Sequence, residues 1–191
     1  TRARATRGED GDEMKRLALY TFGMFREPSA HPVNDGFHQR NDRVFGVIEG
    51  AAGFIARSGY EGDPGPESWG EQVYPRFYVE RGDGYSPSTL SLWESPEAAM
   101  AGSYSGIHAE AMSHGRTWFD KPQWPPYVAW WVEGDHRPDW AEAVDRHEYL
   151  HDHGPSARAF DFKHPFDREG NATTIDRTLF KRLVEANGVT A

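Results

Sequence analysis

Two short apolar stretches set the fold class: LALYTF at residues 17–22 and YVAWWV at residues 127–132. Both are rich in aromatic and branched side chains, which favour extended strands. Side chains alternate along a strand, so neighbours such as Trp130 and Trp131 must point to opposite faces of the sheet. Because aromatic residues therefore occur on both sides, we expect a sheet with two apolar faces.

The rest of the chain predicts further strands and several helices. Strands are expected at 53–59 (GFIARSG), 74–81 (YPRFYVER) and 89–94 (TLSLWE). Helices are expected at about 35–50, after Ser95-Pro96 in two pieces broken near Tyr104, at 138–153 and at 173–187. Without an insertion at 60–73 and a C-terminal extension, this order contains a ferredoxin-like βαββαβ unit, an α+β sheet with both crossover helices on one face.

The second face of such a sheet needs a cover, and a single βαββαβ unit does not supply one. The usual solution is a second subunit whose sheet closes the first into a barrel. We therefore expect a homodimeric α/β barrel built from residues 14–166, preceded by a disordered tail at 1–13 and followed by a helical extension at 167–191.

Composition excludes several classes of function. The 191 residues carry 21 basic and 30 acidic side chains, a net charge of −9, which argues against binding to nucleic acid or to an anionic membrane. Cysteine is absent, which excludes disulfides, thiol nucleophiles and cysteine-based metal sites. No apolar run approaches the roughly 20 residues that span a bilayer, and no apolar segment typical of a secretory signal follows residue 1, so we expect neither a membrane span nor secretion. We expect a cytoplasmic protein.

Seven short segments within residues 15–166 carry a family resemblance. They are Leu90–Ser95, Ser105–Glu110, Trp118–Phe119, Trp130–Val132, His136–Pro138, His153–Ser156 and Phe160–Phe162. These segments resemble a bacterial family of unassigned function in the dimeric α/β-barrel superfamily, alongside the antibiotic-biosynthesis monooxygenases. Relatives by fold include cofactor-free oxygenases of polyketide quinones, haem-degrading monooxygenases, haem-dependent dehydratases and polyketide cyclases. The fold therefore implies no single chemistry.

The resemblance implies a cavity between the sheet and its helical layer, bordered by the second piece of the broken helix. His108 lies on that piece, and the haem-degrading relatives take their axial histidine from the corresponding helix. Alignment from Trp93-Glu94-Ser95 places the ligand position at Met112, with His108 one turn earlier on the same face. His108 is thus a candidate for acid–base catalysis or a substrate hydrogen bond, and His108 or His114 for haem ligation.

The resemblance also suggests a cofactor-free site. Oxygenases of this superfamily place an Asn, a Trp and a Tyr or His around the oxygen atoms of an aromatic substrate. Asn41 interrupts the apolar face of the first predicted helix, and a buried amide needs partners. Arg57, in a short strand, either faces solvent or must find an anion. The candidate catalytic residues are His108, Asn41, Tyr78 and Arg57, and the candidate substrate-binding residues are Trp93, Trp118, Trp131, Phe22 and Met112.

The leading expectation is a monooxygenase of secondary metabolism, acting without a cofactor on a small aromatic or polyketide-like metabolite. His108 or Asn41 would polarise a phenol or enol oxygen so that the substrate itself reacts with dioxygen. The alternatives are a haem-dependent enzyme, a polyketide cyclase or isomerase, and a ligand-binding protein without catalysis.

One further motif, HEYLH at residues 147–151, matches the HExxH pattern of zinc hydrolases. There, His147 and His151 would share a helix face and bind the metal, while Glu148 would activate water. Asp152 places a charge where the metal-binding helix needs an apolar or neutral side chain. We therefore favour an ordinary amphipathic helix with its histidines at a wet edge, and keep a zinc hydrolase as the alternative.

Overall fold

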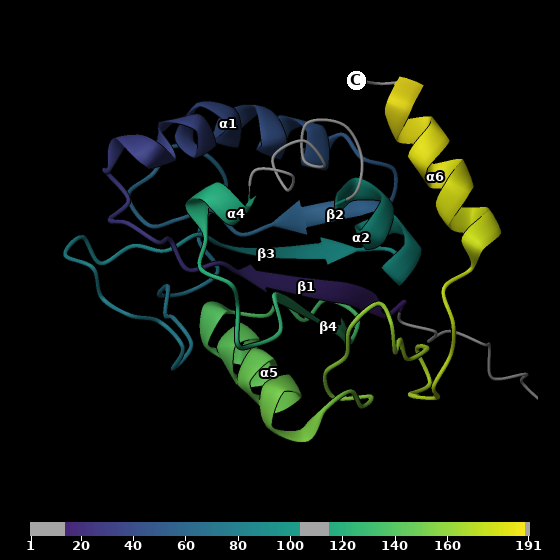
Figure 1. Ribbon diagram of the computed structural model, residues 1–191. Coiled ribbons are helices and arrows are strands. Elements are labelled where there is room, and N and C mark those ends of the chain that lie inside the picture. The colour runs from purple at the N-terminus through teal and green to yellow at the C-terminus, as the bar shows by residue number, and fades with distance from the viewer. Residues whose placement is uncertain (1–13, 104–114, 190–191) are drawn as a thin grey trace, which may run out of the picture.

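The computed structural model describes residues 14–103 and 115–189, which fold around one antiparallel sheet (Figure 1). Its strands are β1 (Arg16–Phe22), β2 (Phe54–Arg57), β3 (Ser88–Trp93) and β4 (Tyr127–Val132). They lie in the order β2-β3-β1-β4, and the sheet is open. The expected α+β class is confirmed, and this strand order is consistent with the expected ferredoxin-like unit.

The described helices are the 3₁₀ turn η1 (Pro32–Asn34), α1 (Asp35–Glu49), α2 (Pro96–Ser103), α4 (Gly115–Trp118), α5 (Trp140–His153) and α6 (Arg177–Val189). Local sequence sets several of their ends. The Asp139 carboxylate accepts the Glu142 N–H at 2.7 Å and starts α5, and Gly154, with φ of +75°, ends it. None of these helices is long and apolar enough to cross a membrane.

The strand register gives the sheet two different apolar faces, as expected. Tyr20 of β1 is paired with Leu90 and Val128, and these three residues belong to the core on the α5 side. The neighbouring Leu19 and Ala129 belong to the core on the other side, where α2 and residues 160–166 pack. Helices α2 and α5 thus cover opposite faces of the sheet (Figure 1).

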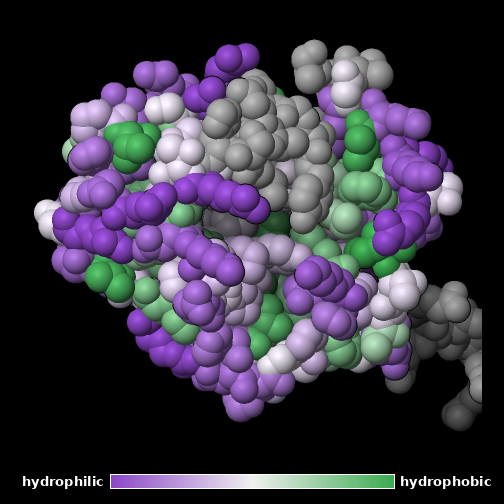
Figure 2. Space-filling model, viewed as in Figure 1, coloured by the Kyte–Doolittle hydropathy of each residue, from purple (hydrophilic) through white to green (hydrophobic). Residues whose placement is uncertain are grey.

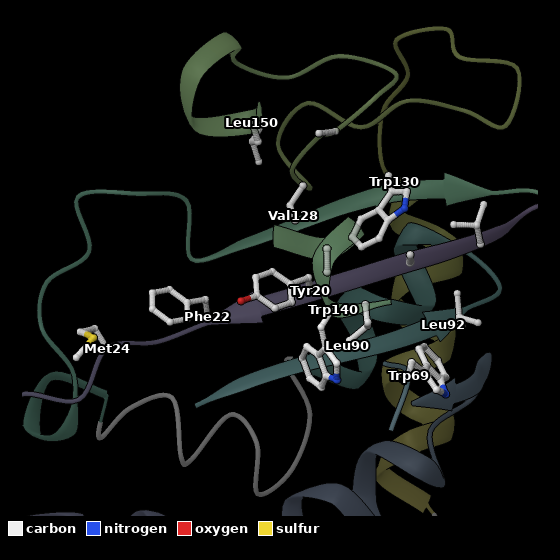
Figure 3. Packing of buried hydrophobic residues seen from close by; sticks show 14 residues of the cluster. Tyr20, Phe22, Met24, Trp69, Leu90, Leu92, Val128, Trp130, Trp140 and Leu150 are labelled. Atoms are coloured by element: carbon white, nitrogen blue, oxygen red, sulfur yellow. The ribbon is translucent and has the colours of Figure 1, made fainter. Parts of the chain in front are cut away.

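The chain covers both faces by itself. On the face expected to meet a second subunit, Trp140 and Leu150 of α5 are buried against the sheet (Figure 3). Residues 61–67 are exposed, as expected for a surface insertion, but Trp69 of the same segment packs into this core and is 5% exposed. The reason for a barrel-forming partner, an uncovered apolar face, therefore does not hold. The homodimer itself stays a prediction.

The strand expected at 74–81 is absent, because this segment of the described chain is a loop. Pro75 has no backbone N–H, the Tyr78 N–H turns back to the Pro75 carbonyl at 2.9 Å, and the Arg76 N–H donates to the Glu148 carboxylate at 2.7 Å. The aromatic side chains of the loop pack against the core on the α5 side. Alternating aromatic residues here serve packing and not strand pairing.

Helix α6 confirms the helix expected at the C-terminal end. The Asp176 carboxylate caps it by accepting the N–H groups of Thr178 and Leu179 at 2.9 and 3.0 Å. The helix lies against α2, Leu183 packs against the core on that side, and the Asn187 side chain accepts the Ala52 N–H at 2.9 Å. The extension is thus part of the folded domain.

Candidate functional site

The predicted site residues do not form one pocket among the described residues. His108, Met112 and His114 lie outside the described part of the chain. The other candidates are divided between the two faces of the sheet. Arg57 and Trp93 lie on the α1 and α2 side, whereas Phe22 and Tyr78 belong to the core on the α5 side.

Each tryptophan proposed as a pocket wall packs in its own surroundings. Trp93 is 2% exposed and its indole N–H donates to the Ser91 hydroxyl at 2.9 Å. Trp118 meets the Phe37 ring edge-on, with centroids 5.7 Å apart. The Trp131 N–H donates at 2.7 Å to a carbonyl of the chain after α5. These contacts are those of core and packing residues.

The proposed catalytic side chains are similarly separated. Arg57 does not simply face solvent but forms an ion pair, because its Nε donates to the Glu49 carboxylate at 2.6 Å. Tyr78 lies on the other side of the sheet, and its hydroxyl donates to the Glu80 carboxylate at 2.8 Å. The backbone N–H of Gly84 also donates to this carboxylate. The bond from Gly84, and then the bond from Tyr78, lowers the pKa of Glu80. Asn41 is half-buried on α1.

A different group of residues gathers polar atoms inside the fold. Between β1 and α5, five rings contact one another through centroid distances of 5.4–6.1 Å. These rings, here termed the His147 cluster, are those of Tyr20, Phe22, Phe77, Trp124 and His147. Tyr20 and Phe22 lie side by side on the same face of β1, and the Tyr20 hydroxyl is directed toward Phe22 (Figure 3).

His147 is held in one tautomer. Its ring is fully buried, and its Nε2 lies 2.5 Å from the Pro125 carbonyl oxygen. Because a carbonyl only accepts, Nε2 must donate and so carries the ring proton. Burial lowers the pKa of His147, which keeps the ring neutral. Nδ1 is then a bare acceptor, and it has no hydrogen-bond partner in the described chain.

Two donors of the same cluster also lack partners. The Tyr20 hydroxyl and the Trp124 indole N–H are buried and make no hydrogen bond among the described residues. Burial raises the pKa of Tyr20, against the smaller opposing effect of the neighbouring Ser88 hydroxyl, which lies outside hydrogen-bond geometry, so the Tyr20 hydroxyl is a neutral donor. Native structures leave few buried polar groups unpaired, and each costs about 1–3 kcal/mol. The His147 cluster thus contains two unpaired donors and one unpaired acceptor among the described residues.

The HExxH residues do not converge as a metal site would require. His147 points into the core, whereas Glu148 accepts the Arg76 backbone N–H on the surface. His151 is exposed, and its Nδ1 lies 3.1 Å from the Arg76 guanidinium and 3.0 Å from the Asp152 carboxylate. Within residues 14–103 and 115–189, no group of three acidic or histidine side chains is arranged to hold a metal ion. The wet-edge interpretation is right for His151 and wrong for His147.

These features define an α+β protein with an open antiparallel sheet and a buried, neutral histidine beside an unpaired tyrosine. The chain belongs to the family described as a domain of unknown function, DUF3291, whose model matches residues 16–176. No curated protein and no solved structure matches it. The matched region contains all of the His147 cluster and ends where α6 begins.

Proposed function

We propose that the His147 cluster binds a small, neutral aromatic or enolic metabolite, and that His147 Nδ1 is the base that takes its hydroxyl proton. The observation that carries this proposal is the set of three buried, unpaired polar atoms in one aromatic cluster. A neutral ligand fits because an isolated charge in such an apolar place would lose its hydration without an ion to pair with.

The three groups have complementary roles toward a phenol or enol. Nδ1 of His147 accepts the substrate O–H and then its proton. The Tyr20 hydroxyl and the Trp124 N–H donate to the oxygen that becomes negative, which stabilises the anion in a site with little water. The rings of Phe22 and Phe77 stack on the substrate ring and orient it.

The reaction that we propose for the resulting anion is oxidation by dioxygen, as in the monooxygenases that the sequence resembles. The electron-rich carbon of the anion forms a bond to one oxygen atom, and the O–O bond then breaks. An activated CH₂ group becomes C=O, and the second oxygen atom leaves as water with the two protons that the substrate lost. Dioxygen is the oxidant, and the protein supplies the base and the hydrogen-bond donors.

The route into the cluster passes the loop that contains Phe77. This ring is half-buried, stacks on Trp124 at 5.4 Å and touches the ring of His147. The adjacent Arg76 ties the loop to Glu148 and to Asp152 of α5. We expect the substrate to enter when this loop moves away from α5.

Binding and turnover are tested separately with hydroxylated aromatic compounds that carry an activated CH₂ group. Quenching of tryptophan fluorescence reports binding, and oxygen consumption reports turnover. We expect Tyr20→Phe to weaken binding about 3- to 10-fold, the range of one hydrogen bond, and His147→Gln to slow oxygen uptake at least 100-fold. Tyr60→Phe is the matched control, since its hydroxyl donates outside the cluster, to the Ser88 carbonyl at 2.7 Å.

The outcomes separate the alternatives. Equal binding by wild type and both cluster variants would remove the proposed site. Product formation that needs no oxygen would indicate a cyclase or isomerase on the same residues, and binding without turnover a ligand-binding protein. The roles predicted for His108 and Asn41 are tested in the same assay, where uptake unaffected by His108→Ala and Asn41→Ala removes them. A haem titration without a Soret band ends the haem alternative.

A further inference from the structure

We propose a second binding site, for a phosphate-type oxyanion, in a depression between η1, α4 and the chain that follows β1. The depression has a volume of about 450 Å³. Its lining residues, here termed the Arg26 site, are Arg26, Glu27, His31, Val33, Arg116 and Thr117. None of them belongs to the His147 cluster, so this site is independent of the function proposed above.

The backbone holds the two arginines in place. Phe25 and Phe119 form an antiparallel bridge, and their rings stack with centroids 5.3 Å apart. On the same bridge the Arg26 N–H donates to the Trp118 carbonyl at 2.9 Å. The Arg26 guanidinium in turn donates to the Arg116 carbonyl at 3.3 Å. The chains carrying both arginines are thereby fixed at the same place, as a preorganised site requires.

The two arginines give this depression a positive charge. The whole chain has a net charge of −9, yet neither Arg26 nor Arg116 has a carboxylate partner in the described ranges. Six other arginines each have one within 3.4 Å: Arg57, Arg76, Arg81, Arg137, Arg146 and Arg158. Glu27 is the only acid among the described lining residues, and with two arginines these residues together keep a positive charge. Figure 2 shows hydrophilic residues over much of this face of the molecule.

The donors in the depression match a tetrahedral oxyanion. The His31 Nδ1 accepts the Val33 N–H at 3.2 Å, so in the neutral ring the proton lies on Nε2 and is available to a ligand. Thr117 adds a hydroxyl, and guanidinium groups bind phosphate through two parallel hydrogen bonds. Donors from four side chains exceed what the two oxygens of a carboxylate need. The geometry therefore points to the phosphate group of a small molecule.

Isothermal titration with inorganic phosphate at pH 7.5 and constant ionic strength tests this site on the full chain. We expect saturable binding of one phosphate, and at least a 10-fold weaker affinity in Arg26→Gln and in Arg116→Gln, the range of a charge-assisted hydrogen bond. Glu27→Gln should bind several-fold more tightly, because it removes the opposing charge. Arg158→Gln is the matched control, since Arg158 is also exposed but is paired with Asp145, and should leave the affinity unchanged.

Two results would overturn the proposal: heats that do not saturate in wild type, or an affinity that both arginine variants leave unchanged. A parallel titration with acetate separates the ligand classes. Acetate binding as tight as phosphate binding would reject a phosphate site in favour of a carboxylate site. Because these side chains are on the surface, circular dichroism of each variant verifies that the fold is retained.

Discussion

The substitution Tyr20→Phe should make the protein more stable, although Tyr20 is one of its most deeply buried residues. The ring is 0% exposed, and its hydroxyl has no hydrogen-bond partner in the described chain. An unpaired buried hydroxyl costs about 1–3 kcal/mol relative to water. Phenylalanine keeps the ring and its contacts with Trp140 and His147 but removes this cost.

The expected gain in the free energy of unfolding is therefore about 1–3 kcal/mol. In a chain of 150–250 residues, each kcal/mol raises the unfolding midpoint by about 2–4 °C. Urea unfolding followed by circular dichroism measures the free energy, and calorimetry measures the midpoint. Tyr60→Phe is the control of opposite sign, because it removes a hydroxyl that donates to the Ser88 carbonyl and should cost about 1 kcal/mol.

The reasoning is refuted if Tyr20→Phe lowers stability as Tyr60→Phe does, because the Tyr20 hydroxyl would then have a partner in the folded protein. A gain in stability together with weaker ligand binding is the opposite result, and it is the expected signature of a binding site. Groups kept unpaired for a ligand reduce the stability of the free protein.

Three further outcomes are expected. Burial lowers the pKa of His147 in the folded protein, so the unfolded chain binds a proton at this residue first as pH falls below about 6.5. The free energy of unfolding should therefore fall below this pH. His147→Gln should remove this part of the pH dependence, measured by urea unfolding. The Arg76 guanidinium, and then His151, lower the pKa of Asp152, so the ionised carboxylate stabilises the fold above the ordinary carboxyl pKa. The difference in the free energy of unfolding between wild type and Arg76→Gln should therefore shrink as pH falls below about 4. Unfolding at pH 7 and at pH 3 measures it. A Cβ at position 102 would lie 2.5 Å from the Trp93 ring, so Gly102→Ala should cost about 1–3 kcal/mol in the same assay.

The position of His147 shows what the spacing of residues on a helix predicts and what it does not. Trp140, Val144 and His147 are spaced four and three residues apart, which already places His147 on the buried side of α5. The same spacing places His151 on that face as well, so the pattern does not distinguish the buried histidine from the exposed one. The pattern does not predict the contacts of His147 with Pro125 and Tyr20, which lie on a loop and on a strand distant in the sequence.

The strands at 17–22, 89–94 and 127–132 and the ends of α5 and α6 follow from local chemistry, because branched and aromatic runs favour strands and Asp139 and Asp176 cap helices next to them in the chain. The segments that cover the second face of the sheet do not follow from local chemistry. Residues 74–81 have the alternation of a strand, yet form a loop over the core because Pro75 and long-range contacts to α5 outweigh that local preference. Which residues meet across the sheet depends on contacts between distant segments, and these exist only once the chain has folded.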